Sequence, residues 1–103
     1  MVGSWDELEA RARQRMYRIE ELGEQMHAVR ERVTSAEGAV TVEVDGNGAL
    51  VDLRFSDEIS RMSPDDFERA VVDAGNEAVR EAFARRAELI ASLAEEFAPR
   101  QAV

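Results

Sequence analysis

The sequence has no cysteine and no long hydrophobic run. Without cysteine, neither a disulfide framework nor a zinc–thiolate site can form. No apolar stretch approaches the ~20 residues that a helix needs to cross a bilayer. The first residues do not resemble a signal peptide, because charged residues follow soon after Trp5. We therefore expect a cytoplasmic protein with no membrane partner.

Lysine is also absent, so all 13 basic residues are arginine, against 22 acidic residues. The formal net charge of -9 is the opposite of the basic balance that is usual in nucleic-acid-binding proteins. Apolar residues make up 45% of the 103 residues, which permits a core, and the length predicts one domain over residues 1–103. Because small domains bury a low fraction of their surface, we expect oligomerisation to complete that core.

Catalytic and metal-binding side chains are scarce. His27 is the only histidine, and no Ser/His/Asp or Cys/His set can be assembled with any specificity. The acidic residues between Asp57 and Glu68 lack the spacing of a calcium loop and are explained by helix capping and solubility. We therefore predict no enzymatic activity, no cofactor and no metal site.

The centre of the chain predicts an antiparallel hairpin. Two runs of alternating apolar and polar residues flank residues 45–48, which read Asp-Gly-Asn-Gly. Alternation places the apolar side chains on one face of a strand, and Asp-Gly and Asn-Gly favour tight hairpin turns. A lone hairpin is marginally stable in water, so its apolar face must be covered by the flanking segments. The apolar positions are Val40, Val42, Val44, Val51, Leu53 and Phe55.

The segment before the hairpin predicts a long helix over about residues 5–33. Ser4 and Glu7 have the spacing of a capping box, which would begin the helix near Trp5. Apolar residues then recur at alternating spacings of three and four, a heptad seam that only Arg15 interrupts. A helix of this length exceeds 40 Å, at ~1.5 Å per residue, and must also pack on another helix or a partner chain. The seam consists of Trp5, Leu8, Ala12, Arg15, Ile19, Leu22, Met26, Val29 and Val33.

The segment after the hairpin predicts a connector, 56–62, and a second helix over about residues 64–97. Ser63 is a helix cap, Pro64 suits the first helical position, and the helix should stop before Pro99. Ile59 and Met62 are expected to anchor the connector. The apolar period changes from 3.5 to 2 and back, which predicts an α+β fold with a sheet over about residues 34–55 between two long helices.

These motifs resemble the YbaB/EbfC family of nucleoid-associated DNA-binding proteins. Residues 38–48 read G-x-V-x-V-x-V-x-G-x-G, a V-x-L-x-F strand follows, and residues 74–78 are similar to an A-x-N-x-A stretch of the family. The resemblance covers most of the chain and implies a short first strand near 33–37, for a sheet of two or three strands. This chain departs from the family in its single glycine before the hairpin and in its lack of lysine.

One basic cluster stands out in the first helix, the segment Arg11–Arg18. It contains four arginines and no acid, and three of them, at i, i+4 and i+7, share one stripe. In a dimer this segment would occur twice and could clamp phosphates. Alternatively, the segment is only a solvated helix face. Two of its arginines have a glutamate four residues earlier, and such i, i+4 pairs commonly stabilise an exposed helix. The DNA-binding prediction names Arg11, Arg13, Arg15 and Arg18.

The sequence thus supports two functions for a homodimer. The family resemblance implies a nucleoid-associated, weakly sequence-selective DNA-binding protein. The net charge favours an adaptor that stabilises a protein partner, in a secretion locus for example, as the resemblance to some actinobacterial relatives implies. In both cases we expect an apolar dimer interface made by Ile19, Leu22, Met26, Val40, Val42, Val44 and Leu53.

Overall fold

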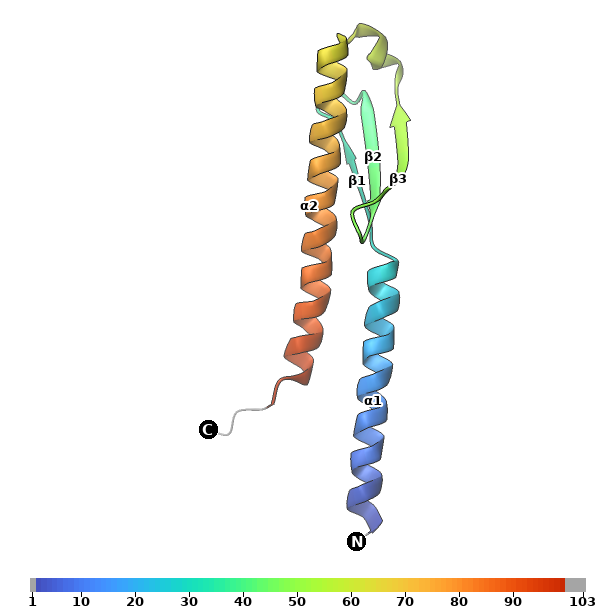
Figure 1. Cartoon of the computed structure of the whole chain (residues 1–103), viewed down its shortest axis with the longest axis vertical. Coiled ribbons are helices and arrows are strands. Elements are labelled where there is room, and N and C mark those ends of the chain that lie inside the picture. The colour runs from blue at the N-terminus through green and yellow to red at the C-terminus, as the bar shows by residue number, and fades with distance from the viewer. Residues whose placement is uncertain (1, 100–103) are drawn as a thin grey trace.

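The computed structural model describes residues 2–99 and has the predicted α+β architecture (Figure 1). An antiparallel sheet with strand order β1-β2-β3 follows α1 in the chain and precedes α2; α2 packs along the sheet, whereas α1 extends away from its end. Within the described residues, no helix has both the length and the apolar character needed to cross a membrane. The elements are α1 (Val2–His27), β1 (Arg30–Thr34), β2 (Val40–Asp45), β3 (Leu50–Phe55), the short 3-10 helix η1 (Asp57–Arg61) and α2 (Pro64–Phe97).

The first helix differs from the prediction at both ends. It begins at Val2, so Ser4 lies inside the helix rather than capping it, and it ends at His27 instead of residue 33. The remaining seam positions, Val29 and Val33, leave the helix and are buried in and beside β1. Such a short apolar pattern is compatible with either a helix or a strand. Here the segment forms a strand, in which Val33 pairs with Val42 of β2. The sheet accordingly has three strands.

The hairpin between β2 and β3 has the predicted turn. The Asp45 carboxylate accepts hydrogen bonds from the backbone N–H groups of Asn47 and Ala49, at 2.9 and 3.0 Å. These two bonds hold the pKa of Asp45 below its ordinary value, because they stabilise the charged form. Gly48 has φ +79°, a left-handed conformation that glycine adopts without strain. The turn over 45–48 therefore follows directly from its local sequence.

The core lies between α2 and the first two strands. Ala74, Ala78 and Ala82 follow one another at four-residue spacing and form a flat ridge on one face of α2. Because alanine is small, the helix lies close to the valines of β2. Connector residues Ile59 and Met62 pack against this cluster as predicted. The buried apolar residues are Val29, Val33, Ala39, Val40, Val42, Val44, Ala74, Ala78 and Ala82.

The start of α2 is fixed by its cap. The Ser63 hydroxyl accepts a hydrogen bond from the Asp66 backbone N–H at 3.1 Å, and Pro64 occupies the first helical position. The helix then continues without interruption to Phe97, the predicted end. Because α2 is longer than the sheet, its C-terminal half extends past the strands and lies beside α1 (Figure 1).

Gly46 is the position where a single methyl group should be most harmful. A Cβ there would lie 2.6 Å from the Met26 carbonyl oxygen and 3.3 Å from the Val29 Cβ. We expect G46A to lower the free energy of unfolding by about 1–3 kcal/mol through overpacking against backbone. The matched change G23A, in exposed helix with nothing within 4 Å, should raise it by up to ~1 kcal/mol. Chemical denaturation of both variants tests this; equal effects would contradict it.

Candidate nucleic-acid interface

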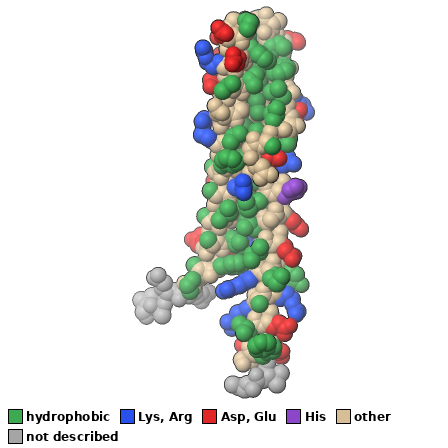
Figure 2. Space-filling model, viewed as in Figure 1, with side chains coloured by type: hydrophobic (Ala, Val, Ile, Leu, Met, Phe, Trp, Pro, Cys, Tyr) green, Lys and Arg blue, Asp and Glu red, His purple; other side chains and the backbone are tan. Residues whose placement is uncertain are grey.

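The arginine segment, Arg11–Arg18, lies on α1 where this helix extends past the sheet. Arg11, Arg13 and Arg15 are exposed, and Arg18 is half-buried. Figure 2 shows basic side chains gathered on this part of α1, near the C-terminal end of α2. The helical spacing of Arg11, Arg15 and Arg18 gives their side chains a common direction. Three guanidinium groups are therefore grouped on one stripe, as the sequence predicts.

Arg18 is bound by two glutamates. Its Nε and Nη2 atoms donate to the Glu96 carboxylate at 3.0 and 2.7 Å, and its Nη1 atom lies 2.8 Å from the Glu21 carboxylate. The hydrogen bond with Glu96 is the main cause of a raised pKa for Arg18 and, conversely, of a lowered pKa for Glu96. A fork that donates twice to one carboxylate is the geometry in which arginine also binds phosphate.

The other arginines of the segment have weaker contacts. The Arg15 guanidinium lies 5.3 Å from the centroid of the Phe97 ring, a cation–π distance. Arg15 interrupts the apolar seam at no desolvation cost, because it is exposed there. Arg13 lies 3.3 Å from Glu9 in an exposed i, i+4 pair, whereas Arg11 has no ion pair within residues 2–99. Arg11 and Arg15 therefore remain accessible to an anion.

Two residues of α2, Glu96 and Phe97, complete this site although the sequence reading did not include them. Glu96 and Arg18 are 78 positions apart, and no local pattern relates them. They meet because α1 and α2 lie side by side beyond the sheet. The middle of α1 and the C-terminal end of α2 together line an open hollow of about 450 Å³, formed by Arg11, Gln14, Arg15, Tyr17, Arg18, Glu96 and Phe97.

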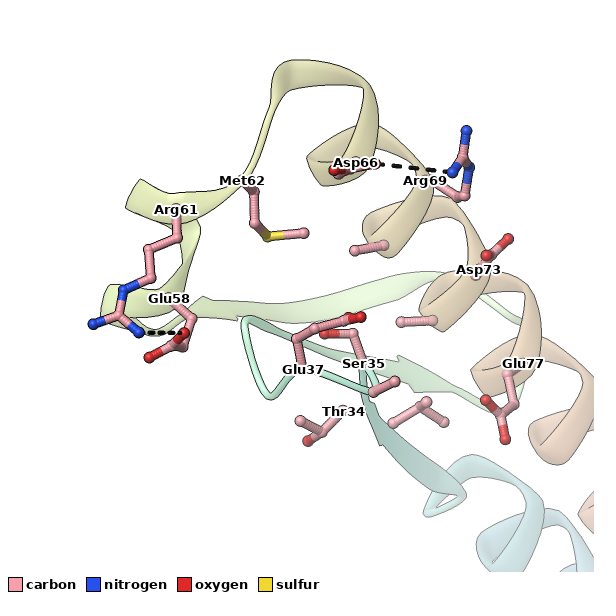
Figure 3. Close-up of a pocket in the computed structure, with 14 residues that line it drawn as sticks. Thr34, Ser35, Glu37, Glu58, Arg61, Met62, Asp66, Arg69, Asp73 and Glu77 are labelled. Atoms are coloured by element: carbon pink, nitrogen blue, oxygen red, sulfur yellow. Dashed lines mark hydrogen bonds and ion pairs between the residues drawn. The ribbon is translucent and has the colours of Figure 1, made fainter.

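The opposite end of the molecule carries an acidic groove of about 610 Å³ between α2, η1 and the end of β1 (Figure 3). Two of its acids form ion pairs: Glu58 lies 3.5 Å from Arg61, and Asp66 lies 3.8 Å from Arg69. Across residues 2–99 no group of three or more carboxylate or imidazole side chains could hold a metal ion. The groove is a poor surface for phosphates, because its remaining acids are Glu37, Asp73 and Glu77, none of which has a cationic partner within the described chain.

An apolar surface, here called the β3 face, lies beside α2. The helix packs on β1 and β2, but it leaves β3 largely uncovered. Leu50 on β3 is 58% exposed and Phe83 on α2 is 48% exposed. Figure 2 shows hydrophobic side chains gathered over the sheet next to α2. The β3 face comprises Leu50, Val51, Leu53 and Phe55 of β3 with the α2 stripe Val72, Val79, Phe83 and Ile90.

The residues expected at a dimer interface divide into two groups. Val40, Val42 and Val44 are almost fully buried beneath their own α2. They are therefore core residues within one chain and present almost no surface to a partner. The other predicted residues, Ile19, Leu22, Met26 and Leu53, are exposed or half-buried, so they can still contact a partner.

Comparisons with known proteins support the same arrangement. The sequence profile of the YbaB/EbfC DNA-binding family matches residues 3–97. A crystal structure of the uncharacterized protein HP0035 from Helicobacter pylori is similar, with a TM-score of 0.65 at 21% identity over 84% of this chain and 91% of that chain. At this identity the similarity concerns the fold. No curated protein matches the chain.

Proposed function

Because the chain belongs to the YbaB/EbfC DNA-binding family, a nucleoid-associated family and not one of enzymes, we propose that it binds DNA as a homodimer with weak sequence selectivity. The observation that carries the proposal is the arginine segment. Exposed guanidinium groups on one stripe suit phosphate oxygens, which are the same for every sequence. Binding through phosphates alone positions a protein on the duplex but does not specify bases. The proposal also implies a cytoplasmic location on the nucleoid.

The proposed dimer is supported by the shape of the chain. Its radius of gyration is 21.2 Å, whereas a compact domain of this length has about 13 Å. A single chain of this shape leaves much apolar surface exposed, and the uncovered β3 face is one contiguous part of it. The opposite sheet face is polar, with Arg32 paired to Glu43 and Arg54 to Asp52. We propose that two copies join through the β3 face and the exposed apolar positions of α1.

Binding should be weak and strongly salt-dependent. The formal net charge of -9 doubles in a dimer, and the acidic groove lies on the same molecule. Phosphates within the Debye length of ~8 Å feel this repulsion at physiological salt. The arginine segment of each protomer must then supply the whole favourable electrostatic contribution. Each phosphate contact releases counterions, so affinity falls as salt rises.

A second function, a homodimeric adaptor for another protein, is favoured by the acidic groove. Its floor is apolar, with Val33 and Ala74 buried and Met62 half-buried, while carboxylates line its rim (Figure 3). A polypeptide segment with arginine or lysine beside apolar residues would match both parts. In this reading the arginine segment is a solvated helix face, and DNA is not bound.

A salt-titrated binding assay distinguishes the two functions. Fluorescence anisotropy with labelled duplexes of unrelated sequence should give binding at ~50 mM salt that is lost by ~200 mM. Affinities for the different duplexes should agree within a few-fold, since phosphate contacts are common to all. Light scattering at micromolar concentration should give the mass of a dimer. Absence of binding at low salt, with an intact dimer, would reject the DNA-binding proposal and favour the adaptor.

A further inference from the structure

The end of α2 lies on the DNA-binding residues proposed above. Glu96 takes both donors of the Arg18 fork, at 3.0 and 2.7 Å, and the Phe97 ring lies beneath the Arg15 guanidinium. Arg18 therefore already has a carboxylate in the position that a phosphate would occupy. Of the three stripe arginines, only Arg11 makes no hydrogen bond, ion pair or cation–π contact with the described residues of α2.

The position of Glu96 is unfavourable for its own helix. The C-terminal end of a helix carries a partial negative charge, which disfavours acidic side chains and favours basic ones. The last turn of α2 nevertheless has Glu95 and Glu96 and no basic residue. Arg18, from the other helix, offsets this cost for Glu96. The carboxylate is thus held by the contact with α1 rather than by its own helix.

We propose that the last turn of α2 is an autoinhibitory clamp, in which Glu96 occupies Arg18 and must be exchanged for a DNA phosphate. The proposal rests on the DNA-binding function. Helix ends fray readily, and Glu96 lies in the last turn of α2, away from the buried core, so opening the clamp requires no change in the core. While the clamp is closed, Arg18 is not available to DNA, so the affinity is lower than the number of arginines in the segment would give.

The test compares E96Q with E95Q. Both substitutions remove one negative charge from the same turn, but only Glu96 contacts Arg18. We expect E96Q to bind a labelled duplex about fivefold more tightly than E95Q at ~50 mM salt, the scale of one exposed ion pair. In an R18Q background the advantage of E96Q should disappear, because there is no arginine to release. Circular dichroism and light scattering check that each variant is folded and dimeric.

Three results are decisive. Equal affinities for E96Q and E95Q would overturn the clamp and leave only the effect of net charge. An advantage of E96Q that persists in the R18Q background would overturn it as well, since the gain would not pass through Arg18. If neither the parent nor E96Q binds DNA at low salt, the proposed function fails, and the clamp with it; binding by the parent without the E96Q advantage rejects the clamp alone.

Discussion

The variant R11Q/R15Q/R18Q is expected to lose DNA binding while it keeps the fold and the dimer. These three arginines share one stripe of α1 in a segment without acidic residues, on a strongly acidic chain. Glutamine keeps the length and helix propensity of the side chain but removes the charge that attracts phosphate. Because 6–10 phosphate contacts change affinity by about 10³–10⁵ over a moderate salt range, losing three per protomer should place binding beyond measurement.

The matched control replaces three arginines elsewhere, in R54Q/R69Q/R85Q. All three are exposed and lie outside the arginine segment, and each is paired with a nearby acid. Net charge changes equally in the two triple variants, so only position differs. Anisotropy at low salt should show nearly parental binding for the control. A segment variant that binds as well as the parent would identify the arginine segment as a solvated helix face.

The second large effect is expected from a charge on the β3 face. Leu53 is paired with Val42 in the sheet, so its side chain lies on the sheet face that α2 covers. Phe83 belongs to the α2 stripe and lies close to Gly48 in the hairpin turn. If the β3 face is the dimer interface, L53D and F83D each bury an unpaired carboxylate in both protomers. Such a charge costs about 3–5 kcal/mol, which corresponds to at least about a hundredfold rise in the dimer dissociation constant.

Light scattering across a dilution series measures that dissociation constant, and thermal melting reports the coupled loss of stability. The control R54D places the same aspartate one position along β3 but on the polar face of the sheet, next to Asp52. It should remain a dimer. Dimeric mass for both L53D and F83D, or a monomeric parent that melts cooperatively, would contradict this assignment of the interface.

Local sequence alone determined several features of this protein. The β2–β3 turn is specified by Asp45, Gly48 and their neighbours, because its hydrogen bonds form within five residues. The start of α2 is specified by Ser63 and Pro64, and its end precedes Pro99. The alternation of apolar residues determined β2, β3 and the α+β class, but not β1. Each of these depends on contacts between residues that are close in the chain.

Other features depended on contacts between distant residues. The spacing that continues a heptad through Val29 and Val33 also suits a strand, and pairing of β1 with β2 chose the strand. Val40, Val42 and Val44 form an apolar strand face in any reading, but only the position of α2 shows that their own chain covers them.

The arginine segment shows the same division. Its stripe on α1 follows from helical spacing, whereas its contacts with Glu96 and Phe97 exist because two helices meet beyond the sheet. Periodicity describes which side chains share a face of one element. What that face contacts is decided by how the elements pack, since that choice depends on the free energy of the whole assembly.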